Sequence, residues 1–107
     1  MITEKRLEDA MDFLASTDDV YGALKADVAQ SEYMAKVAHA LIFKALDGSV
    51  ADREAEAKTH ETVRKEWRKH FEAISQFETL RARRERAILT VEVWRSMEST
   101  RRQGNLQ

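Results

Sequence analysis

Apolar residues recur every three or four positions along most of the chain, which is the spacing that places them on one face of an α-helix. The pattern predicts three helices, over about residues 3–15, 18–46 and 50–103. Thr3 is placed to cap the first helix, and the cluster Ser16-Thr17-Asp18-Asp19 is typical of a break before a new helix begins. These periodicities predict an all-α fold class.

A chain reversal is predicted at residues 46–49. Gly48 can adopt the left-handed conformation that ends a helix, and Ser49 can cap the next helix together with Asp52. No glycine or proline follows before residue 104, so one unbroken helix is expected from residue 50 to about residue 103. We therefore expect a long antiparallel helical hairpin, preceded by a short N-terminal helix, in a single helical domain over residues 1–107.

The long predicted helix carries an apolar line that continues beyond its partner helix. The line runs from Val63 through Phe71 to Trp94, and Arg84 interrupts it. A partner helix over residues 18–46 covers the long helix only to about residue 78, because it is shorter. The first helix and a second copy of the chain are expected to cover the rest, and a monomeric three-helix arrangement is the alternative. The predicted dimer or partner interface consists of Leu80, Ile88, Val91, Trp94 and Met97.

Composition narrows the class of protein. The 107 residues include no proline, no cysteine and only three glycines, which argues against a turn-rich β fold, a disulfide scaffold and a cysteine-ligated metal site. No apolar run is long enough to span a bilayer, and the N-terminus is charged where a signal peptide is apolar. We expect a soluble, cytoplasmic protein, in the host cytoplasm if it comes from a phage.

Charge is sorted along the chain, although the net charge is only −1. Residues 1–30 carry a net charge of −4 and residues 79–107 carry +4, and all basic residues of the second segment are arginine. In the favoured interpretation, N-terminal acids such as Asp18 pair with these arginines within the chain or across a dimer. In the other, the arginines follow a nucleic-acid backbone. The predicted nucleic-acid or partner contacts are Arg83, Arg86, Arg95, Arg101 and Arg102.

Residue types that carry chemistry form no recognisable site. His60 and His70 lie too far apart on one predicted helix to share a metal ion, and each has a glutamate four positions earlier as a helix-surface partner. No nucleophile, base or phosphate-binding loop occurs in a catalytic pattern. We therefore expect a non-enzymatic protein with no metal and no cofactor. Trp67 and Trp94 lie on the apolar line, where packing within the fold or a dimer is favoured over an external partner.

The C-terminal region carries a pattern of arginine, alanine and tryptophan. It consists of Leu80-Arg81-Ala82-Arg83-Arg84-Glu85-Arg86-Ala87, then Val91-Glu92-Val93-Trp94-Arg95, then Arg101-Arg102. This pattern resembles the C-terminal signature of small, mostly uncharacterised bacteriophage and prophage helical proteins that are encoded near recombination and replication genes. The order of residues at Arg81-Ala82 departs from that signature. The resemblance implies an accessory role near DNA metabolism and gives no residue a chemical role.

The leading functional hypothesis is a non-enzymatic, dimeric helical adaptor in a phage DNA recombination or replication complex. It depends on the sorted charge, the uncovered part of the long helix and the resemblance. A direct nucleic-acid-binding protein that uses the C-terminal arginines is the alternative from another class. A structural coiled-coil subunit of a virion or secretion assembly is the third.

Overall fold

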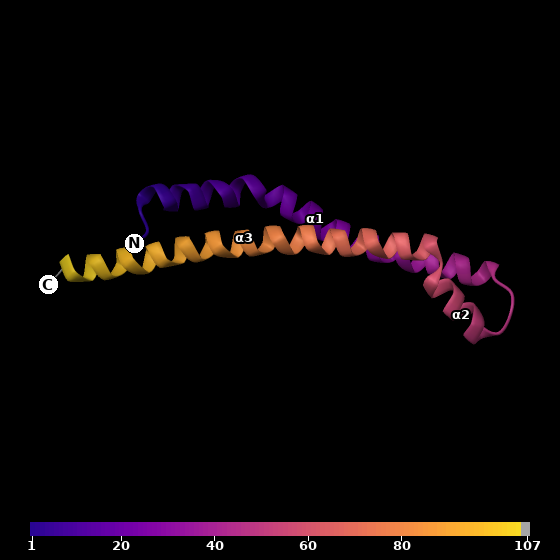
Figure 1. Cartoon of the computed structure of the whole chain (residues 1–107). Helices are drawn as coiled ribbons and strands as arrows, with labels where there is room; N and C mark the ends of the chain where they lie inside the picture. The colour runs from indigo at the N-terminus through magenta and orange to yellow at the C-terminus, as the bar shows by residue number, and fades with distance from the viewer. Residues whose placement is uncertain (106–107) are drawn as a thin grey trace. The chain divides into compact units, whose positions relative to one another are not determined.

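The computed structural model describes residues 1–105. Within them it contains three helices and no strand: α1 over Glu4–Ala45, α2 over Val50–Thr59 and α3 over Glu61–Asn105 (Figure 1). The all-α prediction is confirmed. The predicted cap at Thr3 is also confirmed, because the backbone N–H of Arg6 donates to Thr3 Oγ1 at 3.2 Å.

Contacts divide the chain into two units. Unit 1 joins Met1–Tyr21 to Thr79–Gln107, of which residues up to 105 are described, and unit 2 is Gly22–Glu78. In unit 1 the two helix segments run antiparallel, because Ala10 of α1 lies beside Thr90 and Tyr21 lies beside Arg84. Because α1 and α3 contribute to both units, the single domain over residues 1–107 stays a prediction, as do the hairpin over the whole chain and the dimer.

The predicted break at residues 16–19 is wrong, because α1 runs through them without interruption. Ser16 Oγ and Thr17 Oγ1 each donate to the carbonyl oxygen of Phe13, at 3.1 and 2.7 Å, instead of accepting from backbone N–H groups. Hydroxyl groups that bond back to a carbonyl three or four positions earlier are compatible with a continuing helix. The two helices predicted over residues 3–15 and 18–46 are therefore one helix.

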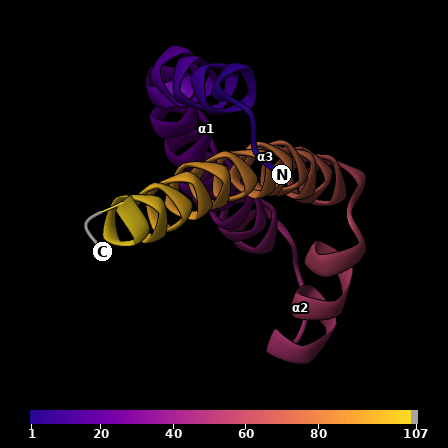
Figure 2. The ribbon, with the colours of Figure 1, turned by 90° about the vertical axis from the view of Figure 1, so that its left-hand side faces the viewer.

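The single helix predicted over residues 50–103 is also wrong, because the chain leaves helical geometry at His60, with φ −64° and ψ 136°. The backbone N–H of His60 donates to Ala57 O at 3.2 Å, and its Nδ1 accepts from the N–H of Thr62 at 3.1 Å. One residue thus ends α2 and caps α3, and Figure 2 shows α2 departing from the direction of the first turns of α3. Histidine is not among the preferred capping residues, so this break could not be predicted from the residue types at the site.

The reversal between α1 and α2 is confirmed. Gly48 has a φ of 116°, and Ser49 Oγ accepts from the N–H of Asp52 at 3.1 Å. Arg53 then closes the end of α1: its Nε and Nη2 donate to Phe43 O at 3.2 and 3.1 Å, and its guanidinium lies 4.1 Å from the centre of the Phe43 ring. A carbonyl in the last turn of α1 therefore receives donors that the helix itself does not supply.

The core is thin and consists mostly of small side chains. Among residues 1–105 the buried apolar positions are Ala10, Ala35, Ala57, Val63 and Ala87. Phe71, which the sequence placed on the apolar line, is 60% exposed, whereas His70 is 6% exposed and has its Nδ1 2.9 Å from Ser31 Oγ. Repeated steps of four residues drift around a helix with 3.6 residues per turn. The inward position that the pattern assigned to Phe71 therefore belongs to His70.

Candidate interaction surfaces

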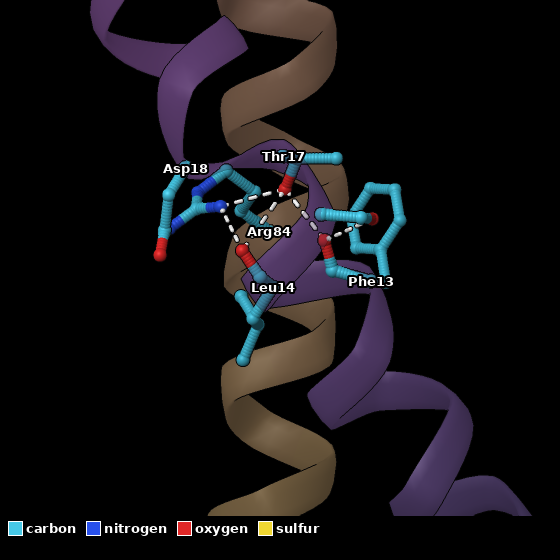
Figure 3. A network of polar contacts seen from close by, with 6 residues as sticks. Phe13, Leu14, Thr17, Asp18 and Arg84 are labelled. Atoms are coloured by element: carbon cyan, nitrogen blue, oxygen red, sulfur yellow. Dashed lines mark hydrogen bonds and ion pairs between the residues drawn. The ribbon is translucent and has the colours of Figure 1, made fainter.

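Arg84 of α3 holds the α1 segment of unit 1 through its guanidinium group (Figure 3). Its Nη1 donates to Leu14 O at 2.9 Å and to Thr17 Oγ1 at 2.6 Å, and its Nη2 donates to Asp18 Oδ1 at 2.8 Å. The Thr17 hydroxyl accepts from Arg84 and donates to Phe13 O at the same time. The side chain of Arg84 is only 15% exposed, so these bonds replace the water that it loses on burial.

The contacts of Arg84 account for two features of the sequence. Arg84 interrupts the predicted apolar line because it faces α1 with polar bonds, and its guanidinium lies 4.9 Å from the centre of the Tyr21 ring. Thr17 and Asp18 do not start a helix, because their side chains bind Arg84. For Asp18 and Arg84, the favoured interpretation of the charge pattern is confirmed. The sequence does contain one signal for this contact, which is an arginine on the apolar line of one helix and a Thr-Asp pair in the segment that packs against it.

Two of the predicted arginine contacts, Arg83 and Arg86, come together on the surface of unit 1. They line a cavity of about 350 Å³ with Ala10 and Phe13 of α1. Among residues 1–105, neither guanidinium has a hydrogen-bond or ion-pair partner. This pair is therefore available to an anion from outside the chain.

The other three predicted arginine contacts lie on later turns of α3. Arg95, Arg101 and Arg102 are all exposed, and Arg101 is paired with Glu98 of the same helix. Arg95 follows Arg86 by nine residues, which is roughly 13 Å along the helix axis at 1.5 Å per residue. The structure therefore does not gather all five arginines into one site.

The predicted interface residues differ in exposure. Leu80, Val91 and Trp94 are half-buried within unit 1, whereas Ile88 and Met97 are 42% and 37% exposed. The first three therefore already have cover from their own chain. Ile88 and Met97 are the members with most surface left for a partner.

Sequence reasoning missed two exposed apolar residues of α3, Leu89 and Val93, which are 57% and 37% exposed. At 100° per residue they lie on the side of α3 turned away from the buried Ala87. Leu89, Val93 and Met97 follow one another at intervals of four, so their side chains are neighbours. We call these three residues the outer apolar patch. The sequence contains this second apolar spacing, but the prediction assigned only one apolar face to the long helix.

The α1 segment of unit 1 presents an acidic outer face. Besides Asp9 and Asp18, which pair with Lys5 and Arg84, the exposed carboxylates of this segment are Glu4, Glu8, Asp12 and Asp19. Met11, which is 54% exposed, lies among them. Unit 1 therefore exposes an acidic face with an apolar side chain on α1, and an apolar patch beside two arginines on α3.

The histidines serve structural contacts in unit 2. His39 Nε2 lies 2.6 Å from Glu54 Oε1, His60 caps α3 and His70 contacts Ser31. The predicted surface pairing of His60 and His70 with glutamates is therefore wrong, because tertiary contacts and the cap use both rings. Among residues 1–105, no three His, Asp or Glu side chains gather closely enough to hold a metal ion.

Comparison with known proteins gives no relative. The chain matches no protein-family model, no curated protein and no solved structure. Within residues 1–105, none of the helices combines the length and apolar character needed to cross a membrane.

Proposed function

We propose that the protein is a non-enzymatic helical adaptor that self-associates through the outer apolar patch of unit 1. The observation that supports this is the exposure of Leu89, Val93 and Met97, at 57%, 37% and 37%, above a core made mostly of alanine. Complete burial of a side chain of this size contributes about 1.5–3 kcal/mol. A second helix laid on the patch therefore adds more apolar burial than any alanine of the core.

Charge complementarity favours a second copy of the chain as the occupant of this patch. Arg83 and Arg86 lie near the patch on α3, and the outer face of α1 carries exposed carboxylates beside Met11. In a two-fold dimer both copies contribute the same surfaces, so any contact between a carboxylate of one copy and an arginine of the other occurs twice.

We propose that the adaptor acts in a phage or prophage DNA recombination or replication complex, in the cytoplasm of the host. The resemblance of the C-terminal pattern to phage and prophage proteins supports this proposal. The dimer then presents two identical copies of its surface to a protein of that complex.

The proposal is tested with Val93→Lys, which places a charge within the outer apolar patch. Light scattering after size-exclusion chromatography is expected to give a dimer for the unmodified chain and a monomer for Val93→Lys. Ser99→Lys is the matched control, because Ser99 is exposed on the same helix and lies about 120° around it from Val93. A Val93→Lys chain that stays dimeric would reject the outer apolar patch as the interface.

Direct binding of nucleic acid is the second candidate. Arg83 and Arg86 favour it, because their guanidinium groups have no partner among residues 1–105. Two guanidinium groups side by side bind phosphate oxygens with planar, charge-assisted hydrogen bonds. Because phosphate binding releases counterions, the affinity is expected to fall steeply with salt.

Fluorescence anisotropy with single-stranded and double-stranded DNA, at about 50 and 200 mM salt, tests this candidate. In the double variant Arg83→Ala/Arg86→Ala, the plot of log affinity against log salt is expected to become less steep. The magnitude of its slope falls by about 2, one for each lost phosphate contact. Lys25→Ala/Lys65→Ala removes the same charge elsewhere and is expected to leave the slope unchanged. An unmodified chain that binds neither DNA at the lower salt removes the candidate.

A further inference from the structure

Unit 2 contains a groove whose lining combines aromatic surface with positive charge. It has a volume of about 660 Å³ and is formed by all three helices. Its lining residues are His39 of α1, Glu54 and Lys58 of α2, and Val63, Arg64, Trp67, Arg68 and Phe71 of α3. The break at His60 creates it, because α2 and α3 would be one continuous helix without that break.

The apolar wall of the groove consists of Val63, Trp67 and Phe71. Val63 is 1% exposed, whereas Phe71 is 60% exposed. The rings of Trp67 and Phe71 are stacked, with centroids 6.1 Å apart and planes at 28°. Together they form an aromatic wall, and part of it is open to solvent. Such a surface binds rings and alkyl chains by apolar contact and stacking.

Three cations surround this wall. Lys58 and Arg64 have no ion-pair partner among residues 1–105, and Arg68 is held by Glu61 at 2.6 Å. The one carboxylate among the lining residues, that of Glu54, contacts His39 Nε2 at 2.6 Å. The groove therefore carries an excess of positive charge next to its aromatic wall.

From this arrangement we propose that the groove of unit 2 is a binding site for a small hydrophobic acid. The ring or alkyl part of the ligand lies on Trp67 and Phe71, and its carboxylate or sulfonate contacts Lys58 and Arg64. The volume of about 660 Å³ lies in the range of small-molecule sites, of roughly 300–1,000 Å³, and apolar walls with a few convergent polar groups are typical of them. A ligand of this class supplies both things that the groove lacks, apolar cover and negative charge.

Two probes that share a ring system test the proposal. Anilinonaphthalene sulfonate is the anionic probe, and N-phenyl-1-naphthylamine is its uncharged counterpart. The experiment uses the full chain carrying Trp94→Phe, so that Trp67 is the only tryptophan, and follows probe emission and Trp67 quenching together. The anionic probe is expected to bind at least tenfold more tightly than the neutral one, and decanoate is expected to displace it where decanol does not.

Variants locate the bound probe. Lys58→Ala/Arg64→Ala is expected to lower the affinity for the anionic probe about fivefold to tenfold, because exposed charge pairs contribute modestly. The affinity for the neutral probe is expected to stay unchanged. Phe71→Ala is expected to weaken both probes. Lys25→Ala/Lys65→Ala is the control with equal loss of charge, and Val93→Lys shows whether the outer apolar patch contributes.

The site is overturned if both probes bind equally tightly, if Lys58→Ala/Arg64→Ala acts no more strongly than its control, or if Val93→Lys alone removes the signal. Self-association through unit 1 is measured separately by light scattering. The two proposals therefore fail independently.

Discussion

Arg84 shows how a charged residue fills a position in an apolar seam without leaving a polar group unsatisfied. Three acceptors on α1 receive its guanidinium N–H groups. Among residues 1–105, no buried side-chain nitrogen or oxygen lacks a hydrogen-bond partner. Removing the Arg84 side chain is costly, because its partners then lose their hydrogen bonds. Replacing it with an apolar side chain of similar size costs less.

Arg84→Ala is expected to lower the free energy of unfolding by about 2–3 kcal/mol, since the hydrogen bonds to Leu14, Thr17 and Asp18 are lost together and a gap opens. Arg84→Leu is expected to cost clearly less. Leucine continues the apolar line, Thr17 keeps its bond to Phe13 O, and Asp18 remains in water. Urea denaturation followed by circular dichroism measures both variants.

Arg83→Ala is the matched control, because Arg83 is adjacent, exposed and unpaired among the described residues. Its unfolding free energy is expected to stay within about 0.5 kcal/mol of the unmodified value. Equal stability of Arg84→Ala and Arg83→Ala would contradict a structural role for Arg84.

Glu61 provides a second prediction at the scale of residues. Arg68 Nη2 donates to Glu61 Oε1 at 2.6 Å, and this hydrogen bond together with the charge of Arg68 lowers the pKa of Glu61 below its ordinary value of 4.5. Folding therefore favours the ionised carboxyl, so its stabilising contribution is present above about pH 4.5 and is lost as the pH falls through the lowered pKa.

An NMR titration of the Glu61 carboxyl is expected to show this lowered pKa in the unmodified chain. Arg68→Ala is expected to raise the pKa toward 4.5, and Lys69→Ala, whose amine pairs with Glu66, is expected to leave it unchanged. The same pKa in both variants would show that Arg68 does not act on Glu61 in solution.

At the scale of elements, the ends of helices decide the fold more than their interiors do. α1 ends before Gly48, whose φ of 116° is rarely adopted by residues with a side chain. A Cβ at Gly48 would meet Asp52 Cβ at 3.9 Å, which is ordinary contact. The cost of a substitution there is therefore conformational and does not come from crowding.

Gly48→Ala is expected to lower the free energy of unfolding by about 1–2 kcal/mol through this backbone strain. Gly22→Ala makes the same change within α1, where nothing lies within 4 Å of the new Cβ. Because alanine favours helix, Gly22→Ala is expected to raise the stability by about 0.5–1 kcal/mol. Thermal and urea denaturation of the two variants check the opposite signs. A loss of equal size at both positions would show that the positive φ of Gly48 carries no special conformational cost.

The sequence predicted those elements whose signal is local. Thr3 and the Gly48-Ser49 turn were predictable because capping residues and left-handed glycine act on their own neighbours. The continuity of α1 was not, because Thr17 and Asp18 serve Arg84, which lies more than sixty positions away in the chain. Nor was the break at His60, since it depends on a ring nitrogen acting as a cap.

The candidate surfaces were predictable only where their residues follow a local pattern in the sequence. Arg83, Arg86, Ile88 and Met97 were among the expected contacts and are exposed. Leu89 and Val93 of the outer apolar patch were missed, and so was the groove of unit 2. The patch requires a second stripe on the same helix, and the groove requires the change of direction between α2 and α3.

At the scale of the whole molecule, the chain buries little apolar surface for the number of large apolar side chains that it carries. Unit 2 exposes Tyr33, Leu41 and Val50 at 67%, 62% and 68%, and unit 1 exposes its outer apolar patch. A core of alanines and one valine contributes modestly to stability. Self-association is therefore expected to stabilise the fold, and the apparent stability then rises with protein concentration.

Sedimentation equilibrium of the unmodified chain, over micromolar to hundreds of micromolar concentration, tests whether the protein self-associates. A dimer that forms over this range gives a mass that rises to twice 12.4 kDa, with a thermal unfolding midpoint that rises with concentration. A mass that stays at 12.4 kDa throughout, with a constant midpoint, would contradict self-association.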